Sequence, residues 1–144
     1  MAGERAILDT NVVLAAHRSE HPTSPNRELL DRWKAGEFTL LHSDDILLEY
    51  AEKMLEYGAA EAEVIAFMAR LQVLGEAVRI EFFHLPRYPP DADDIAFVLC
   101  AINGDASHLV TYDDDLLSFT GDFHFLICKP LIFLGTLRSP PRRK

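Results

Sequence analysis

Two clusters of aspartate residues lie on either side of a short apolar segment, and their spacing indicates where the chain does its chemistry. The first cluster contains Asp91, Asp93 and Asp94, and every residue from 113 to 115 is also an aspartate. Carboxylates that lie about 4–6 Å apart raise one another's pKa, which disfavours the charged forms. A fold that brings several of them together therefore needs a cation, so the chemistry to expect is that of a metal-ion site.

The elements that must position these acids are strands and helices that alternate along the whole chain. Apolar runs predict strands at 6–9, 38–42, 78–83, 108–112 and 123–128, and helical spacing with capping residues predicts helices at 12–16, 26–34, 43–57, 59–74, 91–103 and 130–138. Such alternation is typical of an α/β fold with a mainly parallel sheet. We expect a single-domain α/β/α sandwich over residues 1–138, followed by a basic tail at 139–144.

Four carboxylates are expected to meet at one edge of this sheet. In open parallel sheets, ligands bind beyond the carboxyl ends of the strands. Asp9 ends the first strand, Asp113 follows a later strand, and Asp94 lies in the first turn of a helix that begins at the same edge. Glu49 lies about a turn and a half into its helix and reaches the same point if that helix leans over the edge. Asp115 is a possible fifth member.

A divalent cation is the natural partner of such a set. None of the four acids has a Lys or Arg beside it in the sequence. Cations such as Mg²⁺ prefer oxygen ligands and bind through a few carboxylates together with a substrate phosphate. One metal ion, or two that lie about 3.5–4 Å apart, can activate water and stabilise charge on a phosphodiester.

Simpler roles remain open for several of these acids. An aspartate before a helix often caps it, and an aspartate in a turn can bind its own backbone. Asp9, Asp91 and Asp93 could be helix caps, Asp113 could belong to a turn, and Glu49 and Asp114 could be solvated surface residues.

Bulk properties exclude several classes of protein. The net charge of −9 over 144 residues argues against a broad basic face for nucleic acid, but not against an enzyme that reaches nucleic acid through metal ions.

Cys100 and Cys128 lie in apolar runs and are interpreted as small buried hydrophobes. No apolar run reaches about 18 residues and no signal peptide is expected, so we predict no membrane contact and a cytoplasmic location. The scattered histidines argue against a zinc site.

Four segments resemble, in order, the motifs of the PIN-domain nucleases. Ile7–Ala16, which contains Asp-Thr-Asn, is similar to the opening motif of that family. Ser43 with Glu49 resembles the second motif, and Asp94 with the apolar residues after it resembles the third. Leu109–Leu117, in which a hydrophobic pair precedes Thr, any residue and Asp, resembles the fourth. The similarity spans nearly the whole chain, although Ala92 stands where the family often has a proline.

This resemblance implies a metal-dependent endoribonuclease that uses Mg²⁺ or Mn²⁺. Small members of the family are often VapC-type toxins, which implies RNA as the substrate, an antitoxin as a partner and a possible homodimer. By position, the catalytic acids would be Asp9, Glu49, Asp94 and Asp113, the metal-binding acids would be Asp9, Asp94, Asp113 and Asp115, and the accessory residues would be Asn11 and Thr111.

Two other functions compete with this one. The chain could be a catalytically inactive PIN-fold module that binds RNA or protein. It could also be a receiver-like phospho-acceptor domain, because Lys129-Pro130 after a strand and Thr111 at the end of another resemble that family. Receivers, however, have paired acids after the first strand, whereas Asp9 stands alone.

Overall fold

Alternating strands and helices form the fold of this computed structural model, which describes residues 3–19, 21 and 23–139. The strands are β1 (Arg5–Leu8), β2 (Thr39–His42), β3 (Glu76–Ala77), β4 (His108–Val110) and β5 (Leu126–Cys128). The helices are α1 (Thr10–Arg18), α2 (Pro25–Lys34), α3 (Asp44–Glu56), α4 (Glu61–Leu74), α5 (Ala92–Asn103), α6 (Asp114–Leu117) and α7 (Pro130–Arg138).

The strands form one sheet in the order β3-β2-β1-β4-β5, and every pair in it is parallel. The central strand β1 pairs with β2 on one side and with β4 on the other, with Leu8 opposite Val110. Its apolar residues are fully buried, as expected for a parallel strand that is covered on both faces. The predicted α/β fold with a mainly parallel sheet is confirmed.

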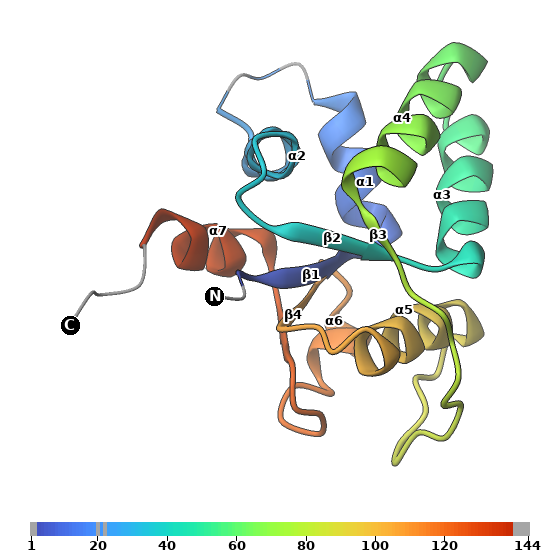
Figure 1. Ribbon diagram of the computed structural model, residues 1–144, viewed down its shortest axis with the longest axis vertical. Coiled ribbons are helices and arrows are strands. Elements are labelled where there is room, and N and C mark those ends of the chain that lie inside the picture. Colours follow the sequence, from blue (N-terminus) through green and yellow to red (C-terminus); the bar gives the residue numbers. More distant parts are fainter. Residues whose placement is uncertain (1–2, 20, 22, 140–144) are drawn as a thin grey trace.

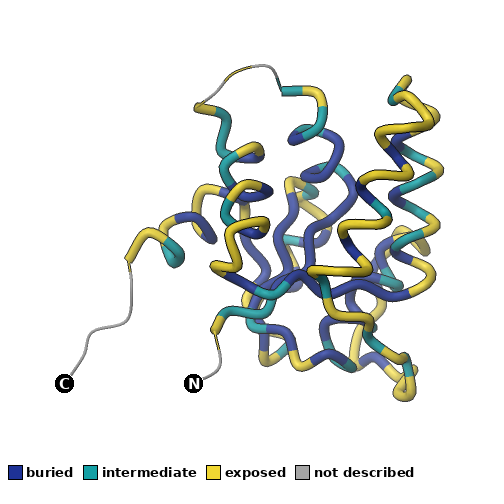
Figure 2. Tube along the Cα trace, turned by 45° about the horizontal axis from the view of Figure 1, so that its top comes forward, coloured by how far each residue is buried: buried dark blue, intermediate teal, exposed yellow. Residues whose placement is uncertain are grey.

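Helices cover both faces of this sheet (Figure 1). Helix α5 packs against β1, β2 and β4 on one face. On the other face, α1 packs between α2 and α3, α4 packs against α3 and β2, and α7 packs against α2. Figure 2 shows that the central strands β1, β2 and β4 are mostly buried while the outer sides of the helices are exposed. Cys100 and Cys128 are buried free thiols within this core, as expected.

The strand order contradicts the receiver-like alternative. Receiver domains have the order 2-1-3-4-5, in which the first strand is not the central one. Here β1 is the central strand and β2 separates it from β3. The interpretation of the chain as a phospho-acceptor domain is therefore wrong.

The predicted strand at 78–83 is also wrong, because the sheet ends just before it. The last contact with β2 is the bond from the Val78 amide to the His42 carbonyl, at 2.7 Å. Beyond it, the Asn103 side chain at the end of α5 accepts from the amides of Glu81 and Phe82 and donates to the Phe82 carbonyl, at 2.8–2.9 Å. The backbone partners that a strand would supply come instead from one amide side chain.

Two smaller differences concern the end of the chain. The predicted strand at 123–128 is shortened to Leu126–Cys128, because its pairing with β4 begins at Leu126, opposite His108. The short helix α6 was not predicted, although Asp113 caps it. The part of the expected basic tail beyond Ser139 lies outside the described residues, and its separation from the domain stays a prediction.

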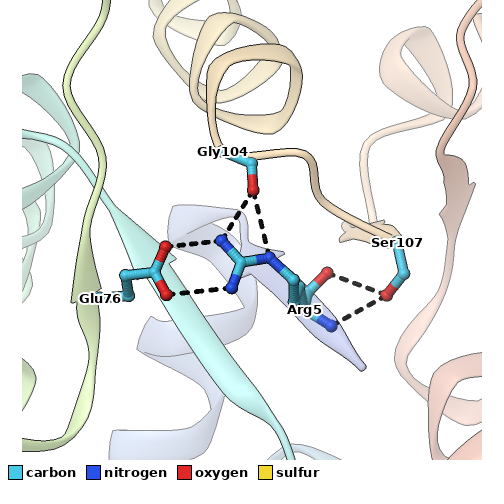
Figure 3. Close-up of polar contacts among 4 residues, drawn as sticks. All are labelled: Arg5, Glu76, Gly104 and Ser107. Atoms are coloured by element: carbon cyan, nitrogen blue, oxygen red, sulfur yellow. Dashed lines mark hydrogen bonds and ion pairs between the residues drawn. The ribbon is translucent and has the colours of Figure 1, made fainter. Parts of the chain in front are cut away.

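An arginine at the start of β1 ties three parts of the fold together (Figure 3). The Arg5 guanidinium donates to both carboxylate oxygens of Glu76 in β3 and to the carbonyl of Gly104 at the end of α5. The Arg5 amide also donates to the Ser107 hydroxyl, which donates in turn to the Arg5 carbonyl. These bonds hold the short edge strand and the end of α5 against β1. Within the described ranges, no helix is long and apolar enough to cross a membrane.

Candidate active site

Asp9 stands at the end of the central strand and is held there by three hydrogen bonds. It caps α1, with its Oδ1 accepting from the Thr10 amide at 2.8 Å. Its Oδ2 accepts from the Thr111 hydroxyl at 2.7 Å and from the Asn11 amide group at 3.3 Å. The carboxylate is 6% exposed. Asp9 therefore caps α1, which is the alternative role predicted for it. It is also a fixed, buried acid at the carboxyl edge of the sheet.

Thr111 and Asn11 join the loop after β1 to the loop after β4. The Thr111 side chain is fully buried, and its Oγ1 accepts from the Asp113 amide at 2.9 Å while it donates to Asp9. The Asn11 Oδ1 accepts from the Tyr112 amide at 3.4 Å. Both residues thus lie where side chains that orient the acids would have to be.

Asp94 is buried in the first turn of α5 and lacks a full set of partners. It is 6% exposed, and its Oδ2 has no hydrogen-bond partner among the described residues. Burial, and after it the negative charges of Asp9, Asp113 and Asp91, raise the pKa of Asp94 to about 7. A buried carboxyl group with a raised pKa and an unpartnered oxygen is one that a cation would stabilise.

Asp9, Asp94 and Asp113 belong to three separate parts of the chain, and their charges affect one another. Burial raises the pKa of Asp9 as well, against the hydrogen bonds from Thr111 and Thr10, and the charge of Asp113 raises it further. Asp9, Asp94 and Asp113 therefore lie close enough to repel one another. In the part of the chain that the structure describes, no group of three or more His, Cys, Asp or Glu side chains is placed as a set of metal ligands.

Glu49 on α3 reaches the same site through Thr10. Its Oε2 accepts from the Thr10 hydroxyl at 3.3 Å. Burial, followed by the charge of Asp93, raises the pKa of Glu49, and Lys53 one turn later partly offsets the shift. Glu49 and Asp93 line a cleft of about 290 Å³ between α3 and α5. The helix does lean toward the site, so Glu49 is a half-buried residue with a polar contact rather than a solvated one.

Asp115 is not drawn into this group. It is exposed, and its contact with Asp113 is the bond from its own amide to the Asp113 Oδ1, at 2.9 Å. Asp91 caps α5 by accepting from the Asp93 amide, and Asp93 and Asp114 are exposed. A role for Asp115 in metal binding stays a prediction.

Tyr50 is a positioning residue that the sequence did not reveal. Its ring is fully buried on α3, and its hydroxyl donates to the carbonyl of Leu8, the residue before Asp9. This bond fastens the helix that carries Glu49 to the end of the strand that carries Asp9. In the sequence, Tyr50 is one residue of an apolar stripe, and a hydroxyl within such a stripe was the available signal.

The site fits a divalent cation by the chemistry of its donors. The four predicted catalytic acids offer oxygen ligands, and none of them takes part in an ion pair within the described residues. The unpartnered Oδ2 of Asp94 is a buried acceptor that a cation would satisfy. Oxygen donors of this kind suit Mg²⁺ or Mn²⁺ better than zinc.

Replacement of Thr111 by Val is expected to weaken this site without disrupting the fold. The substitution keeps the shape of the side chain but removes the bond to Asp9 and the acceptor for the Asp113 amide. Loss of such an orienting partner typically costs about 10–100-fold in metal affinity or activity. Titration with Mn²⁺, followed by the shift in unfolding temperature, measures the loss. Thr120→Val is the matched control, because its hydroxyl bonds to Ile127 and not to the acids; equal losses in both variants would contradict the assignment.

Comparisons with known proteins agree with the fold. Residues 5–115 match the family model of the PIN domain. The chain is similar to the crystal structure of PAE2754 from Pyrobaculum aerophilum, with a TM-score of 0.60 and 15% identity over 97% of this chain and 92% of that one. It is also similar to VapBC2 from Rickettsia felis, bound to a DNA fragment from its promoter, with a TM-score of 0.58 and 17% identity over 85% of this chain and 96% of that one. A search of curated proteins gave no match.

Proposed function

The chain belongs to the PIN domain family, and on this premise we propose that it is a metal-dependent endoribonuclease. The observation that supports the proposal is the state of Asp94: burial, and after it the charges of Asp9 and Asp113, raise its pKa to about 7, and none of the three acids has an ion-pair partner among the described residues. Perturbed carboxyl groups of this kind cluster at catalytic sites. Glu49 beside them supplies a fourth acid.

The chain's own residues would hold the reacting groups in place. Asp9, Asp94 and Asp113 would bind Mg²⁺ or Mn²⁺, which lowers the pKa of water and stabilises charge on the phosphodiester. Thr111 and Asn11 hold the Asp9 carboxylate in one orientation. Burial raises the pKa of Glu49, and its Oε2 accepts from the Thr10 hydroxyl beside Asp9, so Glu49 would serve as the general base for the attacking water.

The proposal extends to the biological role. The VapBC2 structure contains a chain that is similar in fold to this one, and its name matches that of the VapC-type toxins that the sequence resembles. We infer that this chain is the toxin of such a pair, with an antitoxin protein as its partner, RNA as its substrate and a homodimer as a possible assembly. Copurification with the product of a neighbouring reading frame tests the antitoxin, and light scattering tests the dimer.

The test of the activity is cleavage of end-labelled RNA pools of random sequence. With millimolar Mn²⁺ or Mg²⁺, we expect internal cleavage that stops when EDTA removes the metal ion. An inactive PIN-fold module would bind RNA or protein without turnover, and the intact set of acids argues against it. Binding of RNA without cleavage under every metal condition would favour that alternative and contradict the nuclease.

A further inference from the structure

Tyr112 stands between two residues of the site and presents an exposed ring. It separates Thr111, which bonds to Asp9, from Asp113, and it is 39% exposed. Its neighbours on both sides are fixed by the network that holds the acids. Nothing in the role proposed for those acids uses this ring.

The ring is held at both of its ends. At the backbone end, the Tyr112 amide donates to the Asn11 Oδ1 at 3.4 Å, and the same Asn11 donates to Asp9. At the far end, the Tyr112 hydroxyl donates at 2.8 Å to the Oδ1 of Asn26, a buried residue in the first turn of α2. The position of the ring is therefore set relative to the acids, although a large part of its surface faces solvent.

Among the described residues, the other exposed aromatic side chains, which include Tyr88 at 54%, have no hydrogen bond of this kind. Phe82 and Phe83 are 51% and 61% exposed and have no hydroxyl with which to form such a bond. Tyr57, at the end of α3, is 57% exposed and lies under the guanidinium of Arg18, away from the carboxyl edge of the sheet. The fixed position of the exposed Tyr112 ring thus distinguishes it from the other exposed aromatic side chains.

We propose that the Tyr112 ring is the stacking platform for an unpaired nucleobase next to the scissile phosphate. The proposal rests on the proposed ribonuclease function and adds the form of the substrate. The backbone of Tyr112 is linked to Asp9 through Asn11, so the base of a nucleotide whose phosphate lies at these acids would come near the ring. A fixed ring loses little conformational freedom when it stacks on a base, and every base has a face on which it can stack.

Stacking on the ring requires an unpaired base. A base within a duplex is already stacked on its neighbours and paired with its partner, so it cannot reach a protein ring without unstacking.

The test compares intact and abasic substrates. After the cleavage position has been mapped in a short unstructured RNA, copies are made that each lack the base of one nucleotide beside that position. For one of these copies, wild-type kcat/KM should fall roughly tenfold to a hundredfold, the usual worth of one stacked base. Tyr112→Leu should show the same fall on intact RNA and no further fall on the abasic copy.

Three further measurements separate stacking from a structural role. Tyr112→Phe keeps the ring but removes its bond to Asn26, so its loss should be clearly smaller than that of Tyr112→Leu. Tyr57→Leu, which removes an exposed tyrosine elsewhere, should behave as wild type. Equal losses by Tyr112→Leu on intact and abasic RNA would mean that the ring only supports the fold, and would overturn the proposal. Wild-type activity of Tyr112→Leu would overturn it as well. If the wild-type protein cleaves no RNA, the ribonuclease function itself fails.

Discussion

Replacement of Asp94 by Asn is expected to reduce metal-dependent RNA cleavage by on the order of 10²–10³-fold or more, which is the usual cost of removing one electrostatic contributor to a transition state. The substitution keeps the size of the side chain and removes its charge. Asp94 is buried with an unpartnered oxygen, and it lies close enough to Asp9 and Asp113 for their charges to raise its pKa. The substitution would therefore remove from the bound cation the one carboxylate whose oxygen has no other partner.

The matched control is Asp114→Asn, which makes the same change of charge in the neighbouring acidic cluster. Asp114 is exposed in the first turn of α6 and is not one of the predicted acids. Cleavage rates of end-labelled RNA at saturating Mn²⁺ compare the two variants, and circular dichroism confirms that both are folded. Full activity in Asp94→Asn would remove Asp94 from the site, and an equal loss in both variants would show that the effect is one of general charge.

The sheet edge explains why three of the acids were predictable. Asp9 ends an apolar run, Asp113 follows another, and Asp94 begins a helix, so the rule for parallel strands places all three together without knowledge of any contact. The rule does not decide the role of Asp115, because a residue in the second position of a short helix can face solvent, as Asp115 does here. Periodicity identifies the element to which a residue belongs more reliably than it identifies the direction of its side chain.

Other parts of the structure depend on partners that lie far away in the sequence. The strand predicted at 78–83 alternates correctly, but Asn103 takes up the amides of Glu81 and Phe82 in place of a strand. Tyr50 resembles an ordinary core residue until its hydroxyl is seen to bond to Leu8, 42 residues away. Local patterns predicted the sheet and its order of elements, whereas these choices of hydrogen-bond partner are made by tertiary structure.

In the metal-free protein, the charged form of Asp94 should lower the free energy of unfolding, although the same charge is expected to be needed for activity. The pKa of this carboxyl group is about 7 in the folded protein and 3.8 without the fold. Between these values the folded state binds more protons than the unfolded state, so the contribution of Asp94 to stability falls as pH rises from about 4 to about 7. In EDTA at pH 8, Asp94→Asn should therefore unfold at a higher temperature than wild type, and at pH 5 the difference should be smaller.

The contribution of Asp94 is obtained from the difference in unfolding temperature between wild type and Asp94→Asn. Burial lowers the pKa of His42 and of His108, so these residues make stability rise with pH and counteract the carboxyl groups. Both proteins share these histidines, and the subtraction removes their effect. For a domain of this size, each kcal/mol of stability corresponds to a shift of roughly 2–8 °C in unfolding temperature.

Addition of Mn²⁺ at pH 8 should reverse the order of the two proteins. A metal ion present at about 100 times its dissociation constant stabilises the folded state by about 2.7 kcal/mol, and only the wild type keeps the ligand set that binds it. Because the cation must displace the proton of Asp94, its effect on the wild type should be larger at pH 8 than at pH 6. Differential scanning calorimetry in EDTA and in Mn²⁺ measures both orders. A site built for a cation is destabilised when the cation is removed and stabilised when it returns. If Asp94→Asn unfolds at a higher temperature than wild type in Mn²⁺ as well as in EDTA, the repulsion among these acids does not serve metal binding.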